Sequence, residues 1–357
     1  MSNPIKTFVC AAIERSGLWR LPGAHAGGAA TVFTLHRVHA GARPVVDPSF
    51  SISAHFLDAV IGYVIAEGCS VVTLGEMYRR LPAREARPHM VVFTFDDGYR
   101  DNLTVAAPIF ARHGVPWTLY LTTGLPDRTC TYWWGALERL ILQRERVDLD
   151  IGGAPAVFET RTLRQKRVAF SRIAERVRFD GGPELSLRIR ERYGIDDRQL
   201  LAADALSWSE VRQLHGQGVE IGAHAVSHGA LSRLSLDEAR FEMAQSRSRI
   251  ADMTGTLPDH FAAPFGTPDT VGPRESELAR ALSFKTLATT RSANVGPVAH
   301  TDLFQLPRIT LAGEPQRLSR IGLHLSGFVP WVRGGGSIPA SPAPAVAAGA
   351  ANRRSPA

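Results

Sequence analysis

The chain has 357 residues, of which 44% are hydrophobic and 21% are charged, and its formal net charge is +7. This composition fits a globular protein that is large enough for one α/β domain with insertions or for two smaller domains. The three cysteines lie far apart without metal or redox spacing, which argues against a disulfide scaffold, and no apolar run approaches the length of a membrane span, about 18 residues.

Most of the positive charge comes from arginine, in stretches such as residues 161–178. This pattern favours a solvated basic face near anionic glycan or lipid headgroups, and we expect no nucleic-acid partner. The apolar residues 8–13 are followed at once by Glu14 and Arg15, so no signal peptide is expected. We therefore predict a cytoplasmic protein, with a peripheral position at a membrane surface as the alternative. The oligomeric state is left open.

The composition divides the chain into an N-terminal helix and linker, one large α/β domain and a disordered tail, over residues 1–30, 31–332 and 333–357. Residues 31–38 have the pattern of a buried strand with His36 near its end. A core histidine that is hydrogen-bonded to a backbone carbonyl is the ordinary interpretation of that residue. A helix is expected over residues 53–67, where apolar side chains share one face.

The stretch from Met90 to Gly98 combines a buried strand with paired carboxylates. A short apolar run ends in Asp96 and Asp97, and a glycine follows. Adjacent carboxylates raise each other's pKa, and a cation would relieve their repulsion. One of them could then bind a metal while the other accepts a proton, although an isolated Asp-Asp-Gly is more often an ordinary polar turn.

Strands and helices then alternate, which predicts a largely parallel α/β sheet or barrel. Asn102 is expected to cap the next helix, and residues 115–124 to form the next buried strand. The pattern changes over residues 128–206, which we interpret as a helical insertion lying over the sheet. Its paired tryptophans, Trp133 and Trp134, are either core residues or a platform that stacks on sugars.

A second polar element, Gly222–His228, follows a short strand-like run and places His224 and His228 four residues apart. One carboxylate and two imidazoles form a three-ligand set with an open position, as in catalytic zinc sites. Capping boxes at Ser207 and Ser235 predict the helices on either side of this element.

Three ordered motifs, residues 94–99, 224–228 and 261–266, resemble those of the NodB-homology polysaccharide deacetylases, carbohydrate esterase family 4. The resemblance spans about residues 31–330. It implies a distorted (β/α)7-type barrel and a metal-dependent removal of acetyl groups from N-acetylated sugars.

The resemblance also implies roles for individual residues. A divalent metal, Zn²⁺ in preference to Co²⁺ or Mn²⁺, would be held by Asp97, His224 and His228, and Asp96 would be the general base. The residues that it implies for substrate binding are Tyr99, Pro264, Phe265 and Gly266.

The sequence departs from the family pattern in three places. Ala225 stands where a Ser or Thr usually follows the first histidine, so a hydroxyl that supports the loop is missing. The third motif contains no arginine, and Arg308 is the substitute that we predict for orienting the base, with a surface ion pair as the alternative. The late general-acid motif of the family is also missing, because His324 lies on an apolar helical face. The end of the first strand is similar to a variant that carries the acid there, which favours His36 as the acid, with His300 in reserve.

The resemblance therefore implies a hydrolase that removes N-acetyl groups from a sugar polymer, oligosaccharide or precursor and releases acetate. The expected partner is an acetylated glycan or glycan precursor. One alternative is an O-acetyl esterase, because the same attack cleaves esters. The other is a non-catalytic glycan-binding protein on the same fold, which would not need a metal group with a carboxylate beside it.

Overall fold

The computed structural model describes residues 28–41, 46–82, 88–151, 154–179, 181–296, 301–311 and 316–327. Its centre is a sheet of eight parallel strands in the order β11-β10-β9-β6-β5-β1-β12, with β4 paired beside the start of β5. The strands are β1 (Ala30–Leu35), β4 (Ser70–Val71), β5 (Met90–Phe95), β6 (Thr118–Leu121), β9 (Glu220–Ala223), β10 (His260–Ala262), β11 (Thr286–Ala288) and β12 (Ile309–Thr310). A separate parallel pair joins β2 (Arg37–His39) to β3 (Ser51–Ser53).

The two edges of the sheet meet through one segment. Leu306 bridges to Ala288 of β11, and Ile309 pairs with Phe33 of β1. The sheet therefore curls into a distorted barrel. The predicted fold class, an α/β protein with a distorted barrel of parallel strands, is confirmed.

Side chains of the strands alternate between the inside of the barrel and the surrounding helices, as the pleat requires. In β5, Val91, Phe93 and Phe95 belong to the large apolar cluster shared with the outer helices. Met90 and Val92 belong to the inner cluster. The same alternation carries Asp96 to the inner side of the barrel, at the end where the strands finish.

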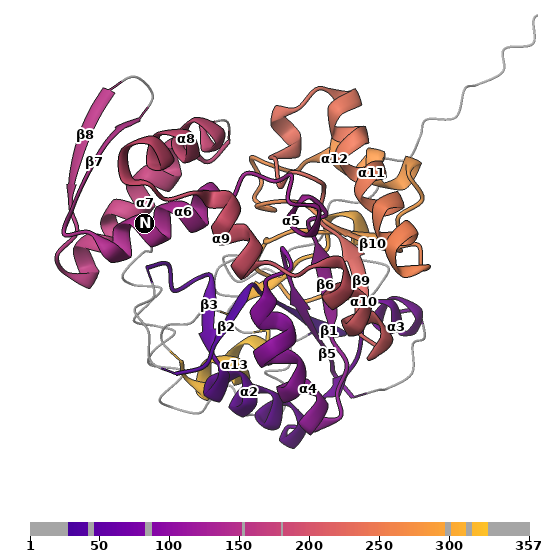
Figure 1. Ribbon diagram of the computed structural model, residues 1–357. Coiled ribbons are helices and arrows are strands. Elements are labelled where there is room, and N and C mark those ends of the chain that lie inside the picture. Colours follow the sequence, from indigo (N-terminus) through magenta and orange to yellow (C-terminus); the bar gives the residue numbers. More distant parts are fainter. Residues whose placement is uncertain are drawn as a thin grey trace, which may run out of the picture.

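Helices cover the outside of the sheet (Figure 1). They are α2 (Ala54–Ala66), α4 (Ala107–His113), α10 (Trp208–Gly216), α11 (Leu236–Thr254), α12 (Pro273–Ala281) and α13 (Leu318–Leu325), with short turns η3 (Leu231–Arg233) and η5 (Leu303–Gln305). Helix α3 (Leu74–Arg80) packs Leu74 and Met77 against the inner cluster, at the end where the strands begin. No helix in the described part of the chain is long and apolar enough to cross a membrane.

Local sequence signals account for several helix starts. The capping boxes at Ser207 and Ser235 are both present, and they begin α10 and α11. The prediction that Asn102 caps a helix is wrong. The chain forms one π-helical turn, η2 (Asn102–Ala106), before α4, and the Asn102 amide donates to the backbone oxygen of His36 at 2.8 Å. Asn102 therefore ties the turn after β5 to the end of β1.

The predicted insertion forms a lobe beside the barrel (Figure 1). Short helix α5 (Gly124–Asp127) comes before the lobe, on the barrel, and the elements of the lobe are α6 (Trp133–Gln143), β7 (Arg146–Ile151), β8 (Ala154–Glu159), α7 (Leu163–Val177), α8 (Gly182–Tyr193) and α9 (Asp197–Asp204). It has an apolar core of its own, built around residues such as Leu140 and Ile173. The antiparallel hairpin β7–β8 was not expected in a helical insertion. The predicted N-terminal helix and C-terminal tail lie outside the described residues.

Candidate metal centre and active site

The Asp-Asp-Gly turn at the end of β5 gives its two carboxylates different partners. Asp97 adopts a left-handed conformation with φ of 75°, which aspartate tolerates better than most residues. Gly98 follows with φ of 107°, and a Cβ there would come within 2.5 Å of a Leu121 methyl group. This turn needs glycine, and it rotates Asp97 away from the inner side that Asp96 occupies.

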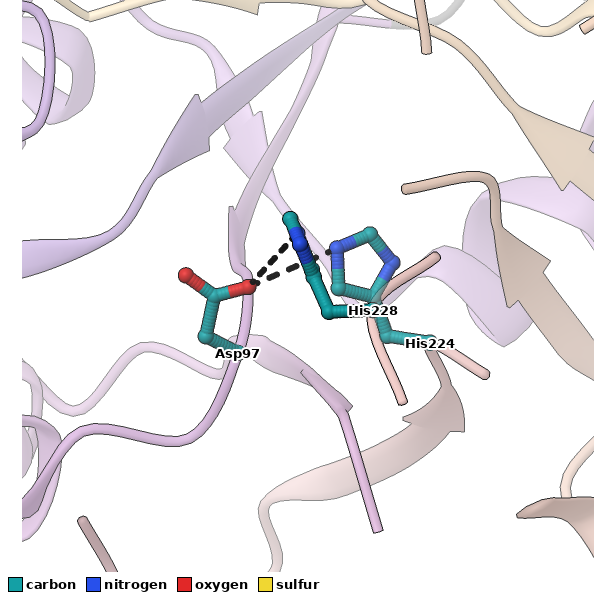
Figure 2. A group of neighbouring side chains, drawn as sticks. All are labelled: Asp97, His224 and His228. Atoms are coloured by element: carbon teal, nitrogen blue, oxygen red, sulfur yellow. Dashed lines mark ion pairs between the residues drawn. The ribbon is translucent and has the colours of Figure 1, made fainter. Parts of the chain in front are cut away.

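Asp97 meets the two histidines of the second motif (Figure 2). Its Oδ1 lies 3.5 Å from Nε2 of His224 and 3.3 Å from Nε2 of His228. Asp97 and His224 are almost fully buried, and His228 is 13% exposed. Asp97 Oδ1 has no hydrogen-bond donor among the described residues. Three ligand-type atoms therefore converge where one acceptor is left unsatisfied.

The histidine tautomer fits metal binding. Nδ1 of His224 lies 2.8 Å from the carbonyl oxygen of Ala262. Because a carbonyl only accepts, Nδ1 carries the proton and the lone pair of Nε2 faces Asp97. Burial lowers the pKa of both His224 and His228 to about 4, so both rings are neutral at pH 7. Neutral imidazole is the form that binds metals.

The spacing also fits one tetrahedral ion. Nitrogen and oxygen atoms held about 2.0–2.1 Å from a common zinc ion lie about 3.3–3.4 Å from each other. The distances of 3.3 and 3.5 Å between Asp97 and the two rings agree with this spacing. Asp97, His224 and His228 are thus a group that could hold a divalent metal.

Asp96 is held by Arg308 inside the barrel. The guanidinium Nη1 donates to Asp96 Oδ1 at 2.6 Å and Nη2 donates to Oδ2 at 2.7 Å. Arg308 has no exposed surface, and it also donates to the backbone oxygen of Thr289 and to the hydroxyl of Thr94, each at 3.0 Å. The alternative of a surface ion pair is therefore wrong, because the pair is fully buried and bidentate.

The charge of Arg308 sets the protonation of Asp96. Burial alone would raise the pKa of this carboxyl, but the adjacent guanidinium outweighs burial and holds the pKa well below its ordinary value. Asp96 is therefore ionised at neutral pH. The same charge makes it a weak base, so it accepts protons only from a donor that is itself strongly acidified.

The loop that carries the histidines has a support that the sequence analysis missed. Ala225 is buried at φ of 63° and offers no hydroxyl. Glu242 of α11 instead accepts from the backbone N–H groups of Val226 and Ser227, at 2.8 and 2.9 Å. Its second oxygen accepts from the Ser227 hydroxyl at 2.8 Å. A helical glutamate 14 residues after His228 gives no local signal of this contact.

A cavity of about 560 Å³ lies over the candidate metal centre. Asp96, Asp97, His224 and His228 line it, together with His36. The volume lies in the range of about 300–1,000 Å³ typical of pockets for single small ligands.

His36 is part of the cavity wall and not a residue of the apolar core. Its ring packs against Phe50 with centroids 4.6 Å apart. Its Nδ1 has no hydrogen-bond partner in the described part of the chain. His36 Nδ1 is therefore not hydrogen-bonded to a backbone carbonyl, as the ordinary interpretation of a core histidine would require. His324 is not among the cavity residues, and His300 lies outside the described residues.

The four residues predicted to bind substrate occupy different positions. Tyr99 lines the cavity but is 1% exposed, and its hydroxyl accepts from Nε1 of Trp134 at 2.8 Å. Phe265 lines the cavity with its ring 5.0 Å from that of His228. Pro264 and Gly266 are buried and are absent from the cavity lining, so they shape the turn that presents Phe265. Substrate binding by these two residues stays a prediction.

Trp134 connects the insertion to the metal centre. Its ring lies 5.3 Å from the ring of His228 while its Nε1 reaches Tyr99. Trp133 also lines the cavity. The paired tryptophans therefore do not belong simply to the core of the insertion.

A comparison with protein-family models gives the class of protein to which the chain belongs. The model of the polysaccharide deacetylase family matches residues 83–279, more than half of the chain, and the chain belongs to that family. Membership supports hydrolytic deacetylation of glycans as the class of activity. A search of curated proteins found no match.

Several solved structures share the fold. They include the Streptococcus pyogenes deacetylase PplD in complex with acetate, which is 18% identical with a TM-score of 0.52, over 80% of this chain and 92% of that one. IcaB from Ammonifex degensii is 16% identical with a TM-score of 0.51, over 84% and 97% of the two chains. A de-N-acetylase from Aggregatibacter actinomycetemcomitans is 14% identical with a TM-score of 0.52, over 82% and 98%. At these identities the likeness concerns the fold alone.

Proposed function

We propose that the chain is a metal-dependent N-deacetylase that hydrolyses the acetamide of an N-acetylated sugar to acetate and a free amine. The observation that carries the proposal is an Asp-His-His group with two neutral imidazoles and a separate ionised carboxylate on the same turn, at the floor of a cavity. Membership in the polysaccharide deacetylase family supports the class of reaction.

Zn²⁺ is the ion that we propose for the group, because one carboxylate and two imidazoles with an open position form the donor set of catalytic zinc sites. When bound, such an ion supplies Lewis acidity, which polarises the acyl oxygen and lowers the pKa of water to about 7. Asp97, His224 and His228 would hold it.

The other residues act on protons and on orientation. Asp96 takes the proton of the attacking water, and the bidentate contact with Arg308 fixes the direction in which its carboxylate points. His36 gives a proton to the departing amine, a contribution worth about 10²–10⁴ in rate. The backbone N–H of Tyr99 helps to stabilise the tetrahedral oxyanion. Phe265 offers an apolar surface to the substrate beside His228.

Acetate release tests the function directly. Purified chain with Zn²⁺ is assayed on N-acetylglucosamine oligomers and on O-acetylated xylan, with and without a chelator. We expect release from the amide substrate only, and its loss with the chelator. Asp96→Asn should abolish turnover while metal stays bound, and the surface variant Asp252→Asn should behave as the parent. Faster release from the ester would identify an esterase, and no release from either by the metal-loaded chain would identify a binding protein.

The general acid is tested separately. His36→Ala should lower kcat by about 10²–10⁴ without loss of bound metal. His324→Ala serves as the matched control, because that residue is outside the cavity. A large loss of kcat in the His324 variant alone would refute the assignment of His36.

A further inference from the structure

The insertion supplies a large part of the wall of the active-site cavity. From α6 come Trp133, Trp134 and Glu138, and α7 contributes Phe170 and residues of its last turns. The barrel supplies the floor with the candidate metal centre. How the insertion is attached to the barrel therefore decides what shape of substrate can reach that centre.

One side of the cavity is closed by the connection between β2 and β3. Asp47, Ser49 and Phe50 of this connection line the cavity. Val46, which precedes them, is only 2% exposed and packs in the apolar core of the insertion, in the cluster that contains Leu140. The barrel side and the insertion side of the wall are thus continuous here.

The end of α7 joins the barrel at a second place, the loop after β10, across the curled sheet from β1. Nη2 of Arg178 donates to the hydroxyl of Thr267, in the loop after β10, at 3.1 Å. The same guanidinium lies 5.1 Å from the ring centre of Phe265, and the ring of Phe179 meets that of Phe265 at 5.9 Å. Arg233 covers Phe179 from the barrel side at 4.8 Å. This contact joins the insertion to the loop that borders the metal centre.

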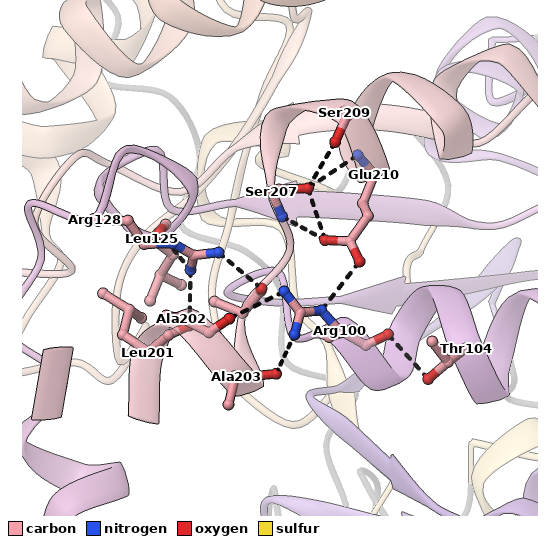
Figure 3. A network of polar contacts seen from close by, with 11 residues as sticks. Arg100, Thr104, Leu125, Arg128, Leu201, Ala202, Ala203, Ser207, Ser209 and Glu210 are labelled. Atoms are coloured by element: carbon pink, nitrogen blue, oxygen red, sulfur yellow. Dashed lines mark hydrogen bonds and ion pairs between the residues drawn. The ribbon is translucent and has the colours of Figure 1, made fainter. Parts of the chain in front are cut away.

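The insertion is also attached to the barrel through α6 and through the end of α9, so its position over the cavity is fixed. Arg37 of β2 pairs with Glu138 of α6 at 3.4 Å. Figure 3 shows two further arginines, Arg100 and Arg128, that donate to backbone oxygens at the end of α9. Nη1 of Arg100 reaches the oxygen of Ala203 at 2.6 Å. These contacts hold the last helix of the insertion against the barrel.

Trp133 is rigidly placed within this wall. A Cβ on Gly182 of α8 would come within 2.4 Å of its ring, so the indole lies directly on the glycine backbone. Its ring also meets that of Trp134 at 5.7 Å, edge to face. A fixed aromatic face in a cavity is suited to stacking on a sugar ring at low entropic cost.

From these contacts we propose that the site takes a short N-acetylated saccharide or the terminal residue of a chain, and not an internal residue of a long polymer. An internal residue needs the chain to leave on both sides, whereas Val46 and Arg178 join the insertion to the loops after β1 and β10, two strands that lie across the curled sheet from each other. The cavity of about 560 Å³ matches a ligand of small-molecule size. The inference rests on the proposed N-deacetylase function.

The position of deacetylation tests the proposal. The metal-loaded chain is incubated with the dimer and the pentamer of N-acetylglucosamine, and the free amines are mapped by mass spectrometry after labelling of the reducing end. We expect amines on a terminal residue only. Amines on internal residues of the pentamer would overturn the proposal while leaving the N-deacetylase function intact. No acetate from either substrate would instead refute the function itself.

Opening the wall gives a second test. Arg178→Ala with Phe179→Ala removes the contact with the loop after β10, and we expect the rate on the pentamer relative to the dimer to rise about tenfold or more. Arg176→Ala, an exposed arginine of the same helix, is the matched control and should leave the ratio unchanged. An unchanged ratio in a folded double variant would overturn the proposal. If the double variant does not fold, the amine map of the parent chain decides.

Discussion

Removing the guanidinium of Arg308 should destabilise the protein strongly, because it leaves the Asp96 charge buried without its partner. Arg308 makes four hydrogen bonds of 2.6–3.0 Å, two of them to Asp96, and it has no exposed surface. In Arg308→Met the carboxylate keeps, among side chains of the described residues, only the Thr34 hydroxyl as a hydrogen-bond donor, at 3.3 Å. Breaking one side of a buried ion pair costs about 3–5 kcal/mol. A loss of this size lowers Tm on the order of 5–10 °C.

The assay is thermal and chemical denaturation in the presence of a chelator, so that bound metal does not add to the free energy of unfolding. The double variant Asp96→Asn with Arg308→Met removes both charges and should be more stable than Arg308→Met alone, because no unpaired charge remains. Equal stability of parent and Arg308→Met would refute the reasoning. The reasoning would also be refuted if the double variant had a lower free energy of unfolding than Arg308→Met, by as much as a second buried defect costs.

Three further predictions follow from other contacts. Glu242→Gln weakens the support of the histidine loop and should lower metal affinity by about 10–100-fold in equilibrium dialysis, whereas the exposed Glu277→Gln should not. Ser235→Ala removes the cap of α11 and should lower the free energy of unfolding in urea by about 1 kcal/mol, with acetate release unchanged. Burial would raise the pKa of Asp127, but hydrogen bonds from Arg249 outweigh burial and hold the pKa below its ordinary value. The ionised carboxylate therefore stabilises the fold at pH values above its unfolded pKa of about 3.9. The Tm difference between parent and Asp127→Asn should therefore be full at pH 7 and shrink as the pH falls below about 4; a difference that persists in acid would contradict the assignment.

Short-range patterns in the sequence predicted much of the fold. The apolar run before Asp96, the capping boxes at Ser207 and Ser235 and the alternation of strands and helices are short-range signals, and each corresponds to an observed element. The sequence analysis did not predict the hairpin β7–β8, although Val147 and Leu149 are buried at alternate positions, which is the period of a strand. The surrounding arginine-rich helical pattern masked a signal only six residues long.

The sequence predicted only some of the contacts between residues that are distant along the chain. Arg308 lies 212 positions from Asp96, and only the resemblance to a family pointed to it. Glu242 and Val46 gave no signal, because their partners lie on other elements and neither residue stands in a motif. Trp134 could be noticed as an unusual aromatic residue, but its simultaneous contact with Tyr99 and His228 depends on how the insertion docks.

The separate apolar core of the insertion has a consequence for how this scaffold can diversify. Residues such as Leu140 and Ile173 stabilise the lobe independently of the cluster under the barrel helices that contains Phe93. Substitutions that reshape the lobe can therefore accumulate without disturbing the strand ends that carry Asp97 and its neighbours. The proposed metal ligands stand on the barrel, and the proposed recognition surface stands largely on the lobe, so the lobe can vary away from Val46 and Trp134 while the metal ligands are retained.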